Sequence, residues 1–430
     1  MADEAAGSPF RPGYNRRPPV LAGRDEVLAA ADEAVAMAVT EALTPPALLL
    51  VGQRGVGKTV LLGEIADRAA QAYGWPRLHV EVTPSTPFTP DVVAAARELV
   101  ASFDDPTPGG LRVREAVVGA GIGPVHGELT FSRDETPADD SAIRLRQALS
   151  AAVDAALRRD AGFVFTIDEM QLADRQELAR LTAILQRGTD LDWPVVLVGA
   201  GLAGMRDPER AVSYFERAEW HEIGTLNHAE TLQALQIPAA NAGRPLDHDA
   251  AEILVEASGG YPYAVQLYGH HAWRASAGQT RINRKAAQRG VLSGGRQLDQ
   301  GLYANRWAQA SPGERNYLAA LASILGSSPE VRGAQVAAEL GVTTRQVGTV
   351  RDRLIKKGTL TSDGELLTFS VPGMADYVRR QVHRNHPAVA AEEHSADGHT
   401  DEVPDLEDGP GRFQPNWPRA QRSDELDLGL

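Results

Sequence analysis

Residues 46–73 carry the pattern that most constrains this chain: a strand, a glycine-rich turn and a helix without interruption. The apolar run from Ala47 to Val51 predicts a buried strand, and Leu61, Leu62 and Ile65 mark the buried side of a helix. The turn between them matches G-x-x-x-x-G-K-[ST]. Its residues, with the one that follows, are Gly52, Gln53, Arg54, Gly55, Val56, Gly57, Lys58, Thr59 and Val60.

Each residue type in this turn suits a chain of phosphates. The glycines let the backbone wrap closely with its N–H groups pointing inward, and the helix that follows adds its positive dipole end. Lys58 is predicted to neutralise the terminal phosphates and the Thr59 hydroxyl to bind Mg²⁺. A chance glycine turn before a helix is the alternative, but the flanking strand and helix favour binding of a nucleoside triphosphate, ATP, with Mg²⁺.

A second motif, an acidic pair after a predicted strand, follows about 110 residues after the glycine-rich loop. Phe163 to Ile167 is an apolar run broken only by Thr166, typical of a strand buried on both faces, and it ends in Asp168-Glu169. Asp168 is predicted to hold the Mg²⁺ shell and Glu169 to polarise the attacking water. An acidic pair after a strand can also cap a helix. The spacing from the phosphate-binding loop favours catalysis, by an ATPase that is slow or stimulated by a partner.

Composition and charge limit the kinds of site and the cellular location that we expect for this chain. The 430 residues include no cysteine, which excludes disulfides, zinc ribbons, iron–sulfur clusters and thiol nucleophiles. No apolar run is long enough to span a bilayer and the N-terminus is polar, so we expect a cytoplasmic protein without a membrane partner. The net charge of −14 is uneven: residues 385–430 contribute −8, whereas residues 307–384 carry +3.

The predicted fold class is α/β. Alternating strands and helices predict a five-stranded parallel sheet between helices, with its last strand near Trp220–Ile223. We expect a disordered lead-in (residues 1–20), the nucleotide-binding core (21–225), a helical lid (226–300), a winged helix–turn–helix domain (301–384) and a disordered acidic tail (385–430). Residues 102–141, rich in Pro and Gly, are predicted to form an insertion within the core.

The order of these motifs resembles a known family. Gly23-Arg24, the loop at 52–59, IDE, VGAGL, SYFERA and SGGYPYAVQLYG together resemble the AAA+/STAND-type P-loop ATPases related to the origin-recognition and archaeal initiator ATPases. The resemblance covers residues 20–382. It implies that Gly23 and Arg24 lie beside the adenine. It also implies a polar sensor at the end of the third core strand, where this chain has Gly199-Ala200-Gly201 instead.

Two further roles come from the same resemblance. Arg217, just before the last core strand, would contact the γ-phosphate, in cis or from a neighbouring subunit, with Arg210 as the second choice. A surface ion pair between Arg217 and Glu216 or Glu219 is the alternative. Pro262, in Gly260-Tyr261-Pro262, would pack near the base, unless it simply opens a helix. The resemblance allows a homo-oligomer when ATP is bound.

The C-terminal module predicts a nucleic-acid partner. Ser311-Pro312-Gly313-Glu314 is a capping box, and a short helix, a turn and a third helix follow, with Asp363-Gly364 turning between two strands. The third helix of such a winged helix would enter the major groove of duplex DNA. Its candidate contacts are Arg345, Gln346, Thr349, Arg353, Lys356 and Lys357.

Three functions are open at this point. The first is an ATP-hydrolysing switch that couples nucleotide state to DNA binding. The second is an ATP-driven signalling or assembly switch whose winged helix, or acidic tail, docks a protein partner. The third is a regulator that binds ATP without turnover; the missing polar sensor favours it, and Glu169 argues against it.

Overall fold

The chain forms two units, residues 1–295 and 296–430. The structure, a computed structural model, describes residues 7–104, 138–206, 212–326 and 331–384, apart from Tyr14 and Ser85. The acidic tail, Arg210 and most of the predicted insertion lie outside these ranges.

The first unit is built on a parallel sheet of five strands in the order β2-β3-β4-β1-β5. The prediction of a five-stranded parallel sheet is confirmed, with the last strand one residue earlier than expected. Strand β1 lies between β4 and the edge strand β5, so the glycine-rich loop that follows it starts between the carboxyl ends of these two strands. The strands are β1 (Leu48–Val51), β2 (Arg77–Glu81), β3 (Phe163–Asp168), β4 (Val195–Gly201) and β5 (Glu219–Glu222).

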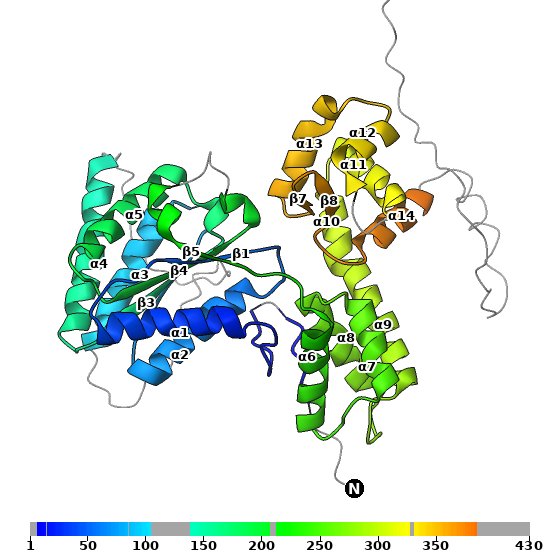
Figure 1. The fold of residues 1–430 in the computed structure, drawn as a ribbon, viewed down its shortest axis with the longest axis horizontal. Helices are drawn as coiled ribbons and strands as arrows, with labels where there is room; N and C mark the ends of the chain where they lie inside the picture. The colour runs from blue at the N-terminus through cyan, green and yellow to red at the C-terminus, as the bar shows by residue number, and fades with distance from the viewer. Residues whose placement is uncertain are drawn as a thin grey trace, which may run out of the picture. The chain divides into compact units, whose positions relative to one another are not determined.

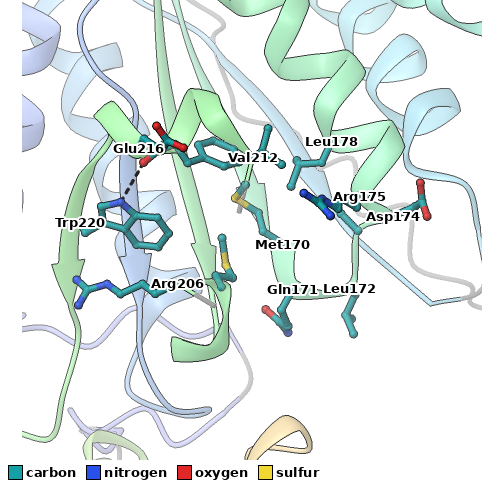
Figure 2. Close-up of a pocket in the computed structure, with 13 residues that line it drawn as sticks. Met170, Gln171, Leu172, Asp174, Arg175, Leu178, Arg206, Val212, Glu216 and Trp220 are labelled. Carbon is teal, nitrogen blue, oxygen red and sulfur yellow. Dashed lines mark hydrogen bonds between the residues drawn. The ribbon is translucent and has the colours of Figure 1, made fainter. Parts of the chain in front are cut away.

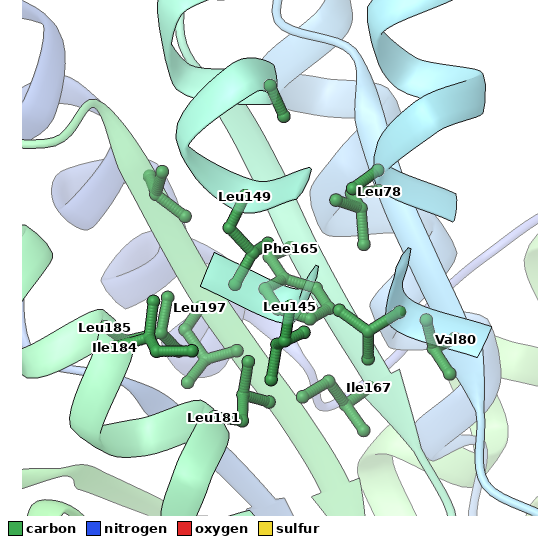
Figure 3. Packing of buried hydrophobic residues seen from close by; sticks show 14 of the residues in the cluster. Leu78, Val80, Leu145, Leu149, Phe165, Ile167, Leu181, Ile184, Leu185 and Leu197 are labelled. Carbon is green, nitrogen blue, oxygen red and sulfur yellow. The ribbon is translucent and has the colours of Figure 1, made fainter. Parts of the chain in front are cut away.

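Helices cover both faces of this sheet (Figure 1). On one face lie α1 (Asp25–Thr40) and α2 (Lys58–Tyr73), and on the other α3 (Phe88–Asp104), α4 (Ala138–Leu157) and α5 (Arg175–Thr189). The second face encloses the main core, where Phe165, Leu149 and Leu181 interdigitate at under 2% exposure (Figure 3). Burial on both faces explains why β3 and β4 read as continuous apolar runs.

The segment of the first unit that follows β5 is helical, and its role as a lid stays a prediction. Its helices are α6 (His228–Asn241), α7 (His248–Ser258), α8 (Pro262–Ala275) and α9 (Arg284–Leu298). A capping box of Asn227 and Glu230 opens α6, and Gly259 in the left-handed conformation ends α7.

Our expectation of disorder at the N-terminus is wrong for the described residues between 7 and 20. Phe10 is 2% exposed, and its ring lies where a side chain on Gly269 of α8 would be. Arg17 forms an ion pair of 2.5 Å with the buried carboxylate of Glu64 on α2. One aromatic anchor and an ion pair to a buried carboxylate hold a segment that has no periodicity of its own.

The second unit combines helices with a small antiparallel sheet of order β6-β8-β7. The capping box at Ser311 and the hairpin at Gly364 are present where the sequence placed them. The strands are β6 (Val331–Arg332), β7 (Leu360–Asp363) and β8 (Leu366–Phe369). The helices are α10 (Ala304–Ala308), α11 (Pro312–Ile324), α12 (Gly333–Glu339), α13 (Thr344–Lys356) and α14 (Met374–Arg384). No helix within the described ranges is long and apolar enough to cross a membrane.

Candidate nucleotide site

The loop between β1 and α2 has a backbone that depends on its glycines. Gly55 and Gly57 have φ values of 82° and 96°, in the left-handed region that favours glycine. A Cβ on Gly52 would lie 2.1 Å from the Ile223 carbonyl oxygen. A Cβ on Gly57 would meet no atom within 4 Å, so the loop opens there. The loop is therefore closely packed at Gly52, against the end of β5, and open at Gly57, where α2 begins.

Lys58 lies inside this loop and is only 8% exposed. Its ammonium donates to the carbonyl oxygens of Gly52 and Gln53, at 2.8 and 2.6 Å. Burial lowers the pKa of Lys58 to about 8, although the carboxylates of Glu169 and Asp168 raise it. A positive group held by neutral carbonyls in a poorly solvated place is a suitable partner for an anion.

The end of β3 brings the acidic motif to the loop. The Thr59 hydroxyl donates to the Asp168 carboxylate at 2.5 Å, although 109 residues separate them. Asp168 is 2% exposed; burial raises its pKa, and the Thr59 hydroxyl and the Glu169 N–H offset part of that effect. A hydroxyl and a carboxylate in contact are two hard oxygen ligands of the kind Mg²⁺ prefers.

Glu169 follows with an unusual backbone. Its φ of 53° lies in the left-handed region, which is uncommon for a residue with a side chain. Its N–H donates to Asp168 at 2.8 Å, and its carboxylate accepts a hydrogen bond from the Gln171 amide and lies 3.9 Å from the Arg54 guanidinium. Such backbone outliers concentrate at functional sites.

These residues fit a magnesium nucleotide. The Gln53 side-chain oxygen is buried without a hydrogen-bond partner among the described residues, beside the Lys58 ammonium, which donates to two carbonyl oxygens. Lys58 and the loop N–H groups would hold the phosphates, and Thr59 and Asp168 would hold the metal. Among the described residues no cluster of three or more His, Cys, Asp or Glu could hold a metal by itself.

A family model described as AAA ATPase domain matches residues 20–198. Over these residues the chain is similar to AAA ATPase domains. A second model, described as a domain of unknown function (DUF8462), matches residues 300–378. No curated protein matches the chain.

Solved structures agree with this family at the level of the fold. A Walker-type ATPase of Pyrococcus abyssi is 14% identical with a TM-score of 0.58, over 86% of this chain and 98% of that one. The ORC2 protein of Aeropyrum pernix, in ADPNP–ADP complexes, is 14% identical with a TM-score of 0.55, over 89% and 98%. At such identities the likeness concerns the fold alone.

Within the residues that this family model matches, Arg24 connects the loop to the segment that leads to the lid. Its guanidinium donates to the carbonyl oxygens of Val56 at 3.2 Å and Gly224 at 2.7 Å, and it is 8% exposed. Burial lowers its pKa, opposed by the Glu230 carboxylate. Gly23 precedes it with a φ of 66° and packs against Glu230. The adenine contact expected for this pair stays a prediction.

Sequence reasoning missed Tyr261, the lid residue that reaches the loop. Its side chain is 2% exposed and its hydroxyl donates to the Arg54 carbonyl oxygen at 3.0 Å. A Cβ on Gly55 would lie 1.9 Å from this hydroxyl. Pro262 is the first residue of α8, the structural alternative stated above, and its contact with a base stays a prediction. The motif Gly260-Tyr261-Pro262 indicated a functional residue at this position, but we assigned that role to the proline and not to the tyrosine.

Arg217 ends the short helix Ser213–Arg217 directly before β5 and is exposed. Within the described ranges it forms no ion pair with Glu216 or Glu219, the alternative considered from the sequence. Its predicted role is untested. A cavity of about 620 Å³ lies beside this helix, between the segment after β3 and β5 (Figure 2). There the Arg206 guanidinium lies 5.3 Å from the centre of the Trp220 ring.

The six candidate DNA contacts fall into two groups, according to whether the side chain is engaged in a contact within the second unit. Arg345, Thr349, Arg353 and Lys356 are exposed on α13. Gln346 instead closes a capping box, where its side-chain oxygen accepts from the Thr343 N–H at 2.8 Å. Lys357 forms an ion pair of 2.7 Å with Glu314, which is 2% exposed. The last two side chains are thus engaged within the unit.

Proposed function

We propose that this protein binds Mg-ATP, hydrolyses it and couples the nucleotide state to DNA binding through its second unit. The observation that carries the ATPase part is the contact of Thr59 with Asp168, beside the buried Lys58. It joins the phosphate-binding loop to the acidic strand end in one site. One protein of similar fold is described in ADPNP–ADP complexes, which agrees with this proposal.

The residues have distinct tasks in the proposed hydrolysis. Lys58 and the loop N–H groups bind and orient the phosphates. Mg²⁺, held through Thr59 and Asp168, supplies neutralisation of the charge that develops on the phosphate oxygens. Glu169 accepts the proton of the attacking water, whose oxygen bonds to the terminal phosphorus as the bond to the ADP oxygen breaks. Arg217 and Pro262 are proposed to report the nucleotide state to neighbouring elements.

Two substitutions test this site. Lys58→Ala removes charge-assisted hydrogen bonds of about 1.5–3 kcal/mol each, so ATP affinity should fall about a hundredfold or more. Glu169→Gln should bind ATP within a few-fold of wild type and lose turnover by about 10² to 10⁴. Equilibrium binding and steady-state hydrolysis measure the two effects, with Lys285→Ala on the exposed side of α9 as control. Wild-type affinity in Lys58→Ala would remove the basis of the proposal.

For the second unit we propose a winged helix whose α13 contacts duplex DNA. The exposed side chains of Arg345, Arg353 and Lys356 on one helix support contact with phosphates, and Thr349 lies among them. The second candidate is docking of a protein partner. The ion pair of Lys357 with Glu314 within the unit favours that candidate, because it neutralises part of the positive charge available to DNA.

A further inference from the structure

The carboxyl end of β4 is shaped to receive the segment that follows β3. A Cβ on Gly199 would lie 2.1 Å from the Met170 sulfur. A Cβ on Gly201 would lie 2.0 Å from the Met205 sulfur and 2.8 Å from the Gln171 side-chain oxygen. These two glycines therefore explain why no polar side chain stands at the end of β4. Any side chain there would displace Met170 or Gln171.

Gln171 joins the acidic motif to this strand end. Its side-chain amide donates to the Glu169 carboxylate, and its oxygen accepts from the Leu202 N–H at 3.1 Å. Leu202 directly follows β4. The glutamine thus connects the proposed general base to the backbone of the neighbouring strand. A glutamine can do this because one side chain carries both donors and an acceptor.

The Glu169 carboxylate has few contacts that could fix its orientation. Its ion-pair partner Arg54 is half exposed and 3.9 Å away. An exposed pair at that distance contributes little to orientation. The hydrogen bond from Gln171, which is partly buried, is therefore the main constraint on the Glu169 carboxylate among the contacts described here.

We propose that Gln171 is a positioning residue for ATP hydrolysis: it fixes the Glu169 carboxylate to the end of β4 and supplies the polar group that this strand lacks. The inference rests on the proposed ATPase activity and adds a residue to it. A misplaced general base reduces the rate of the chemical step without weakening substrate binding. The expected signature is therefore a change in kcat alone.

The test compares three variants of the full-length protein. Gln171→Met keeps the length of the side chain and loses both hydrogen bonds; kcat should fall about ten- to a hundredfold, with KM and the Kd for ATP within about twofold. Gln171→Glu keeps the oxygen that faces Leu202 but places a second carboxylate beside Glu169, and kcat should fall at least as far. Gln176→Met, on the exposed side of α5, is the matched control and should behave as wild type.

The outcomes separate this inference from the proposed function. Suppose that the wild type hydrolyses ATP and that Glu169→Gln abolishes this turnover. A kcat within twofold of wild type in Gln171→Met would then overturn the role of Gln171 and leave the proposed ATPase activity intact. Equal losses in ATP affinity and kcat would show a structural role and would also overturn it. Absence of turnover in the wild type would remove both proposals. If Gln171→Met does not fold, Gln171→Leu, which also loses both hydrogen bonds without adding a charge, decides by the same criteria.

Discussion

Lys356 and Lys357 are adjacent at the end of α13, and only the folded unit distinguishes them. The ammonium of Lys357 donates to Glu314, a carboxylate that also accepts from the Ser311 N–H at 2.8 Å. Glu314 closes the capping box at the start of α11 and is 2% exposed. Lys357, although its side chain is 46% exposed, thus stabilises the start of a helix that lies far from it in the sequence, whereas Lys356 forms no such ion pair among the described residues.

Replacement of Lys357 by Met should destabilise α11 by about 1–3 kcal/mol, because it leaves a buried carboxylate with one charge-assisted partner fewer. Replacement of the exposed Lys356 by Met should change stability by less than about 0.5 kcal/mol. Amide hydrogen exchange of α11 in the full-length protein measures the free energy of opening for both variants. Equal protection in the two variants would contradict the structural role of Lys357.

The same ion pair has a pH dependence. Burial raises the pKa of Glu314, but the hydrogen bonds from Lys357 and Ser311 outweigh it, and the pKa lies below its ordinary value of 4.5. The folded state therefore binds fewer protons on this group than the unfolded state, and its contribution to stability is present above pH 4.5. We expect the difference between wild type and Lys357→Met to shrink as pH falls through the folded-state pKa of Glu314.

Individual residues of the site differ in how far the sequence predicts them. Lys58, Thr59, Asp168 and Glu169 stand in contiguous motifs whose residue types follow from their chemistry, and the structure places them together. Gln171 carries no such signal in the sequence. Its importance depends on contacts with Glu169 and Leu202 that arise only when β3 and β4 are aligned.

At the level of elements, the lid and the phosphate-binding loop meet at the start of α8. Gly260 has a φ of 68°, and its missing side chain admits the Leu226 carbonyl oxygen, which would lie 2.0 Å from a Cβ. This close approach brings Tyr261 to Arg54. The two glycines before Tyr261 are thus needed for the end of α7 and for this contact, and the proline after it opens α8.

Replacement of Tyr261 by Phe tests the coupling of lid and loop. The buried ring stays in place, whereas the hydrogen bond to the Arg54 carbonyl oxygen, about 0.5–1.5 kcal/mol, is lost. We expect ATP to bind about two- to tenfold more weakly, because the loop is less well ordered before binding. Titration with ATP measures this, with Tyr263→Phe on the same helix as control. Unchanged affinity in Tyr261→Phe would show that the contact does not shape the site.

Elements were predicted more completely than their contacts. Strands β1, β3 and β4 could be predicted from the sequence because burial on both faces leaves runs of apolar residues, and β2 could be predicted from its alternation. The N-terminal segment could not be read in this way. Its order depends on Phe10 and Arg17 meeting partners on α8 and α2, and a segment without periodicity gives no sign of such partners.

At the scale of the whole molecule, the first unit matches an AAA ATPase family model and the second unit has exposed cations on α13. The chain as a whole carries a net charge of −14, so non-specific attraction to DNA is weak and contact would depend on few residues. Arg353 and Lys356 are the two exposed cations nearest the end of that helix. Coupling between the units is the central claim.

Steady-state ATP hydrolysis with and without duplex DNA tests this claim most directly, with Glu169→Gln as the blank. We predict turnover in the wild type, an increase when duplex DNA is added, and loss of that increase in the double variant Arg353→Glu, Lys356→Glu while basal turnover is retained. Turnover that is indifferent to DNA, with no salt-sensitive binding to duplexes, would contradict the coupling and favour a protein partner for the second unit.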